Sequence, residues 1–134
     1  MGLFNWFTQE IAIDLGTANT LIIHNDEVVV NEPSIVALNR NNPKEVLAVG
    51  KRALMMHEKT HESIKTVRPL KDGVIADFNA AELMLREMIK MVYPKKPLFP
   101  PSWRMMICIP SSITEVEKRA VRDSAEQAGA KEVY

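Results

Sequence analysis

The chain has 134 residues, and its 17 basic residues are balanced by 17 acidic ones. This length, with 46% hydrophobic residues, excludes a disordered chain and is enough for a sizeable core. The zero net charge argues against a nucleic-acid-binding protein, for which we expect a basic excess. The single cysteine, Cys108, excludes an internal disulfide, and its apolar neighbours predict a buried, inert thiol.

The first nine residues predict a short amphipathic helix. Such aromatic-rich helices bury favourably at a membrane interface, so we expect a weak membrane anchor. The alternative is a segment that packs on its own domain. The sequence has no apolar run of transmembrane length and no signal-peptide pattern, so we expect a cytoplasmic protein. The large apolar side chains of this helix are Leu3, Phe4, Trp6 and Phe7.

A small polar turn then separates two apolar runs. Residues 11–15 and 20–23 both predict buried strands. The turn between them, from Gly16 to Asn19, has no bulky side chain, so its backbone N–H groups can approach a phosphate closely. Asp14, at the end of the first run, is placed to hold a hydrated Mg²⁺. An ordinary hairpin explains the same residues equally well.

The middle of the chain predicts short strands and one short helix. Strands are expected at 28–30, 34–38 and 46–49, with a break before Ser34 that includes Pro33. Residues 51–57 predict a helix. The polar stretch 60–77 is expected to be mainly loop.

The last third predicts two helices that alternate with strands. Asn79, with Glu82, is expected to cap a helix over 80–92, and a proline-rich surface loop follows. After a strand over 104–109, Ser112 or Thr114 is expected to cap a second helix that ends near Gly129. We expect i,i+4 pairs on its charged face, and a narrow small-residue face. The small residues are Val116, Ala120, Ser124, Ala125 and Ala128.

This order predicts an α/β fold with a mixed sheet and flanking helices. A further strand begins at 131, so the sheet looks incomplete. We therefore expect a portion of a longer protein.

One competing motif predicts a different chemistry. His57, Glu58 and His61 match the His-Glu-x-x-His pattern of zinc metallopeptidases. On one helix both imidazoles would bind Zn²⁺, with Glu58 as general base. A third ligand is not obvious: Glu82 is at a plausible distance along the sequence, but it also serves the predicted cap of the next helix. Solvated surface histidines are the alternative.

Four segments carry a resemblance to a known family: residues 13–20, 31–34, 67–78 and 113–121. The Asp-Leu-Gly-Thr core of the first is typical of the actin/Hsp70/sugar-kinase superfamily. Together with Gly-Val-Ile-Ala-Asp-Phe in the third and the charged helix after it, the chain resembles the N-terminal portion of MreB-type bacterial actins. Another ATPase of the superfamily, chaperone-like or kinase-like, is the alternative.

The resemblance implies a ribonuclease H-like, actin-family ATPase fold, here incomplete. It implies an amphipathic segment over 1–10, subdomain IA over 11–33 and 78–134, and a small inserted subdomain IB over 34–77. The cofactors would be ATP and Mg²⁺. The first phosphate loop matches Gly16, Thr17, Ala18 and Asn19, and Asp14 matches the aspartate that positions hydrated Mg²⁺.

The function implied is that of a cell shape-determining filament. It would self-associate on the inner face of the cytoplasmic membrane and guide the cell-wall elongation machinery, which keeps rods rod-shaped. The charged helix matches a filament contact, through Glu115, Lys118, Arg119 and Arg122.

Two departures from the family pattern affect activity. Residues 58–63 lack the Thr-Pro-Gly turn of many relatives, and the sequence stops before the second phosphate loop, the adenosine-binding segment and the water-activating glutamate. We expect the whole protein to hydrolyse ATP and this portion to be inactive.

Overall fold

The computed structural model describes residues 8–59, 61–92, 102–109 and 113–134. The expected membrane anchor at Leu3, Phe4, Trp6 and Phe7 lies outside these residues, as does most of the proline-rich loop. No helix within the described ranges is both long enough and apolar enough to cross a membrane.

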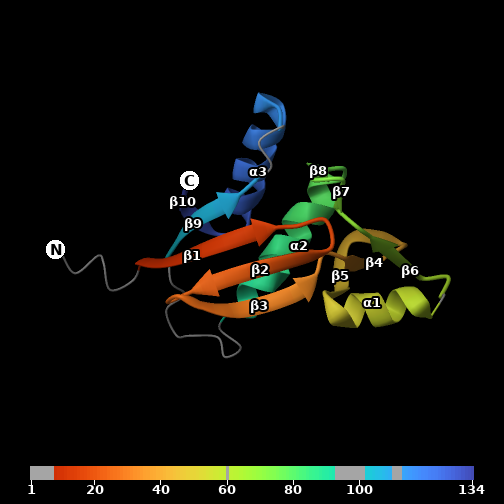
Figure 1. Cartoon of the computed structure of the whole chain (residues 1–134). Helices are drawn as coiled ribbons and strands as arrows, with labels where there is room; N and C mark the ends of the chain where they lie inside the picture. The colour runs from red at the N-terminus through yellow and green to blue at the C-terminus, as the bar shows by residue number, and fades with distance from the viewer. Residues whose placement is uncertain (1–7, 60, 93–101, 110–112) are drawn as a thin grey trace.

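A mixed five-stranded sheet, in the order β10-β9-β1-β2-β3, forms the centre of the molecule (Figure 1). Strands β10, β9 and β1 run parallel, whereas β2 and β3 pair antiparallel to their neighbours. The strands span Thr8–Leu15 (β1), Asn19–His24 (β2), Glu27–Pro33 (β3), Ser102–Cys108 (β9) and Ala130–Val133 (β10). The α/β fold class is therefore confirmed.

Two helices cover one face of this sheet. Helix α2, Phe78–Lys90, buries six side chains, and its Met84 packs among sheet residues such as Ile13 and Met105. Helix α3, Glu115–Gln127, packs beside α2. In Figure 1, α2 lies behind strands β1 to β3, and no helix from the described residues covers the opposite face of these strands.

A second sheet lies beside the first, in the order β5-β4-β6. The short helix α1, Lys51–Glu58, packs against this sheet, and a small hydrophobic core lies between them. A two-stranded hairpin, β7 with β8, connects it to α2. The strands span Val36–Asn39 (β4), Asn42–Val49 (β5), Ile64–Val67 (β6), Leu70–Lys71 (β7) and Val74–Ile75 (β8).

Several sequence predictions were wrong in detail. The stretch 60–77 is not mainly loop, since it contributes β6, β7 and β8. The predicted break before Ser34 is part of β3, because three residues up to Pro33 pair with β2 and this edge strand tolerates a terminal proline. Cys108 is exposed, because its alternation along β9 points it away from the helices.

Of the two predicted helix N-caps, the cap of α3 is confirmed and the cap of α2 is wrong. Asp77, not Asn79, caps α2, because its carboxylate accepts a hydrogen bond from the backbone N–H of Ala80 at 3.0 Å. Thr114 caps α3, and Glu117 completes the capping box.

The expected small-residue face of α3 is confirmed for Ser124 and Ala125 and is wrong for Val116. The helix buries Val121, Ser124 and Ala125, whereas Val116 is 77% exposed. Its ion pair within the described residues joins Lys118 to Glu115, at 2.9 Å, in place of the expected i,i+4 pairs.

Candidate functional site

The turn from Gly16 to Asn19 lies at the carboxyl ends of two parallel strands. Asp14 of β1 is in register with Cys108 of β9, so both strands end at this edge of the sheet. Open α/β sheets bind ligands outside the carboxyl ends of their strands. The turn therefore occupies the edge where a ligand is expected.

The turn is tight, and only glycine fits at its first position. The N–H of Gly16 donates to the carbonyl of Asn19 at 3.0 Å, and a Cβ on Gly16 would lie 2.4 Å from that oxygen. Because the obstructing atom belongs to the backbone, no side-chain rotation relieves the contact. A larger residue at position 16 must change the path of the turn.

Ser34 holds the turn in place with two hydrogen bonds. Its hydroxyl donates to the carbonyl of Gly16 at 2.7 Å, and its backbone N–H donates to the carbonyl of Ala18 at 2.8 Å. Since its one hydroxyl proton is used there, Ser34 accepts the hydrogen bond of 2.8 Å from the buried hydroxyl of Thr20. The carbonyl groups of Gly16 and Ala18 therefore both point toward Ser34.

The amides of the turn are left available. Within the described residues, no acceptor bonds the backbone N–H of Thr17 or Ala18. Successive N–H groups without internal acceptors form an anion-binding nest. The structure thus brings the predicted phosphate-loop residues into an arrangement that fits a phosphate, and their role in binding one stays a prediction.

Asp14 fits the role of a metal-positioning carboxylate. Its side chain is exposed beside the turn, and it has no ion pair among the residues that the structure describes. A carboxylate near a phosphate nest suits Mg²⁺, which keeps several waters and uses few protein ligands.

The hairpin β7–β8 reaches the same turn from the other side. In Figure 1 this hairpin lies near the end of β1. The backbone N–H of Gly73 donates to the hydroxyl of Thr17 at 2.9 Å, which links residues 56 positions apart. Thr17 therefore joins the turn to the hairpin that precedes α2.

Sequence reasoning missed the supporting residues Ser34, Thr20 and Gly73. The signal for the first was present, since Asn31-Glu32-Pro33-Ser34 carried the family resemblance without an assigned role. The motif also serves α1, because the carboxylate of Glu32 accepts a hydrogen bond from the backbone N–H of Lys51 at 2.8 Å. An acceptor at a helix N-terminus stabilises that end.

Replacing Ser34 with alanine is expected to destabilise the chain by about 1–3 kcal/mol, because the buried hydroxyl of Thr20 and the half-buried carbonyl of Gly16 lose their partner. Chemical denaturation measures this change. Ser63→Ala, which removes a hydroxyl from an exposed turn, is the control and should cost much less. Equal losses in the two variants would contradict the supporting role of Ser34.

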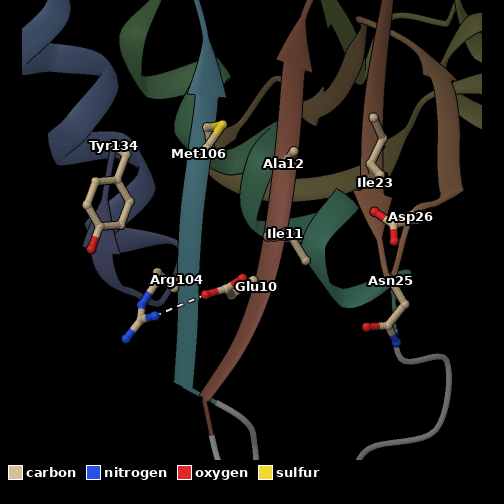
Figure 2. A pocket seen from close by; sticks show the side chains of 9 residues that line it. All are labelled: Glu10, Ile11, Ala12, Ile23, Asn25, Asp26, Arg104, Met106 and Tyr134. Atoms are coloured by element: carbon tan, nitrogen blue, oxygen red, sulfur yellow. Dashed lines mark hydrogen bonds and ion pairs between the residues drawn. The ribbon is translucent and has the colours of Figure 1, made fainter. Parts of the chain in front are cut away.

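The helix-free face of the main sheet holds a hollow of about 580 Å³, away from the turn. Figure 2 shows Arg104 on β9, with a dashed line for its ion pair to Glu10 on β1. Arg104 also pairs with Glu132 at 2.9 Å, and the hydroxyl of Tyr134 donates to the same carboxylate at 2.7 Å. These contacts form a charge ladder across β1, β9 and β10.

The ladder shifts the titration of its members. The hydrogen bond from Tyr134, and then the charge of Arg104, lower the pKa of Glu132. The bond to Glu132, with some desolvation, raises the pKa of Tyr134. Hydrogen bonding to Glu10 and the charge of Glu132 raise the pKa of Arg104.

Because the pKa of Glu132 is lowered in the folded chain, its ionised carboxylate stabilises the fold at pH values above the ordinary pKa of 4.5. This stabilisation is lost as the pH falls through the folded-state pKa. Carboxyl-carbon NMR should therefore show Glu132 titrating below 4.5 in the native chain. Tyr134→Phe should move the pKa of Glu132 upward, because it removes the largest cause of the shift. No change in that variant would refute the ladder.

The predicted filament-contact residues share one exposed surface. Glu115, Lys118, Arg119 and Arg122 line a hollow of about 540 Å³ on α3, together with the exposed Val116. The structure brings these four together, and their role in a filament stays a prediction.

The zinc arrangement is not formed. Helix α1 ends at Glu58, so His57 and His61 do not share one helical face. His57 contacts the hydroxyl of Thr66, and His61 accepts from the backbone of Ser63. The described residues contain no group of three His, Cys, Asp or Glu side chains placed to hold a metal ion, so Glu82 is not a third ligand.

Comparison with known proteins decides the family. The family model described as MreB/Mbl protein matches residues 8–134. The chain belongs to the MreB/Mbl family. The predicted resemblance to MreB-type bacterial actins is confirmed.

Two curated relatives show the extent of the match. The cell shape-determining protein MreB of Escherichia coli K12 is 47% identical over 132 residues, and Mbl of Bacillus subtilis 168 is 49% identical over 129 residues. Each match covers 96% of this chain and 38% of the relative. The chain thus spans well under half of an MreB/Mbl protein.

Solved structures agree with the family. The crystal structure of MreB5 of Spiroplasma citri bound to ADP matches with a TM-score of 0.77 and 38% identity, over 94% of this chain and 37% of that one. A MamK double helical filament matches with a TM-score of 0.74 over 94% and 39% of the two chains. At 18% identity, MamK shows the actin-like fold alone. The predicted actin-family fold is confirmed, and the subdomain boundaries at 11–33, 34–77 and 78–134 stay predictions.

Proposed function

We propose that this portion of an MreB/Mbl protein holds one side of a nucleotide, with the turn from Gly16 to Asn19 clamping a phosphate. One observation carries the proposal: within the described residues, the backbone N–H groups of Thr17 and Ala18 have no acceptor, and Ser34 holds the turn that contains them in place. The MreB5 neighbours, which were solved with ADP and with AMPPNP, support it. Asp14 would position hydrated Mg²⁺ beside the phosphate.

The whole protein would use ATP to assemble into a filament. The names of the curated relatives support a role in cell shape, and the exposed α3 surface is available for self-association. Attachment to the inner face of the cytoplasmic membrane through residues 3–7, guidance of the cell-wall elongation machinery and ATP hydrolysis belong to this proposal. We expect the present portion alone to bind nucleotide weakly.

Asp14→Asn tests the metal-positioning role. The amide keeps the size and loses the charge, so Mg²⁺ should no longer strengthen nucleotide binding, while binding without Mg²⁺ should change little. Isothermal titration with ADP, with and without Mg²⁺, measures both. Asp26→Asn, in the turn after β2, is the matched control. A Mg²⁺ effect that survives in Asp14→Asn would remove Asp14 from the site.

A further inference from the structure

A third hollow, of about 620 Å³, lies beside the smaller sheet, away from the turn that contains Gly16. The described residues of its wall come from the turn after β4, from the end of α1 with Lys59, from His61 and Glu62, and from strand β6. Its apolar and hydroxyl lining comes from Met56, Ile64 and Thr66. Its charged and imidazole lining comes from Arg40, His57, Lys59, His61, Glu62 and Lys65.

The charged side chains that line this hollow are mostly basic. Arg40, Lys59 and Lys65 carry three positive charges, two imidazoles add further donors, and Glu62 is the only acidic residue of the lining. None of these basic groups forms an ion pair among the described residues. In a chain whose net charge is zero, this local excess attracts a negatively charged ligand.

The end of a helix does not account for the cluster. Basic groups near the C-terminus of α1, such as His57, are favoured by the helix dipole without any ligand. Arg40, however, comes from the turn between β4 and β5, and Lys65 comes from β6, so both bring their charges to the same hollow from outside the helix.

Hydrogen bonds hold together two of the segments that carry these donors. The backbone N–H of Arg40 donates to the carbonyl of Ser63 at 2.9 Å, which ties the β4–β5 turn to the segment before β6. The Nδ1 of His61 accepts from the backbone N–H of Ser63 at 3.2 Å. The neutral ring therefore carries its proton on Nε2, on its opposite edge, where it is a donor.

We propose that this hollow binds a phosphate group, either inorganic phosphate or a phosphomonoester headgroup. A compact, multiply charged oxyanion accepts bonds from a guanidinium, an ammonium and imidazoles at once. The volume is typical of a small-ligand site. Among the described residues, no Phe, Tyr or Trp side chain lines the hollow to offer a stacking platform of the kind found in single-stranded nucleic-acid sites.

The test is a titration of the ¹⁵N-labelled chain with inorganic phosphate at constant ionic strength. Saturable shifts are expected at the amides of Arg40, His61 and Lys65, separate from any at the turn with Gly16. In Arg40→Ala with Lys65→Ala, affinity at this second set should fall by about tenfold or more.

Two matched variants separate the specific site from general charge. Lys44→Ala with Lys131→Ala removes the same charge from exposed positions outside the hollow and should keep the wild-type affinity. Arg40→Lys with Lys65→Arg keeps the charge in the hollow and should retain most of the affinity. Equal weakening in the two double-alanine variants, or shifts that never saturate, would overturn the proposal.

Vesicles distinguish the two sources of phosphate. If phosphatidylcholine vesicles that contain phosphatidic acid sediment the chain in a manner that depends on Arg40 and Lys65, the source is a headgroup. If free phosphate binds and these vesicles show no such dependence, the site takes a soluble phosphate. Binding of polyglutamate without binding of phosphate would overturn the proposal in favour of an acidic peptide.

Discussion

Gly16→Ala is expected to weaken nucleotide binding by about a hundredfold, because displacing the turn loses two charge-assisted hydrogen bonds worth about 1.5 kcal/mol each. The added Cβ would meet the carbonyl oxygen of Asn19 at 2.4 Å, and the turn must open to avoid it. The amides of Thr17 and Ala18 then no longer converge on one phosphate. Titration with Mg–ADP measures the loss.

Gly129→Ala is the control for this variant. Gly129 has a φ of +111°, so alanine strains the backbone there as well, but no atom lies within 4 Å of the added Cβ. Both variants should lose stability, and only Gly16→Ala should lose nucleotide affinity. Nucleotide affinity unchanged in Gly16→Ala would show that the turn is an ordinary hairpin.

Met84→Ala is expected to destabilise the chain by about 2–5 kcal/mol, since it leaves a cavity between α2 and the main sheet. Met84 is completely buried and belongs to the core cluster of the sheet. Because α2 packs against both the sheet and α3, little of the surrounding structure can collapse into the space. Urea unfolding monitored by circular dichroism measures the change.

Met55→Ala removes the same side chain from a surface position. Met55 is 59% exposed on α1, so its loss should cost well under 1 kcal/mol, as is usual for surface substitutions away from special features. Comparable losses in the two variants would contradict the packing of α2 against the sheet.

The sequence predicted the elements whose pattern is local. The apolar runs around Gly16, the helix after Thr114 and the strand from 131 all appear near their expected positions. The stretch 60–77 was misjudged because its strands are short, and because β6 acquires its partner, β4, from a distance. Local propensity carries little information about such pairings.

The candidate site was predicted in the same uneven way. Gly16 to Asn19 and Asp14 are adjacent in sequence, so their chemistry is visible as a motif. Ser34 and Gly73 lie far along the chain, and only folding brings them to the turn. The orientation of Cys108 was wrong because an apolar run does not reveal which of two strand faces a helix will cover.

The binding of a phosphate by the turn is the central claim, and a residue-resolved titration of the chain with Mg–ATP tests it most directly. We predict that the amides of Thr17 and Ala18 shift saturably, and that Gly73 follows because its N–H is bonded to the hydroxyl of Thr17. Amides of the turn that stay unmoved while ATP binds elsewhere, or shifts that never saturate, would contradict the claim.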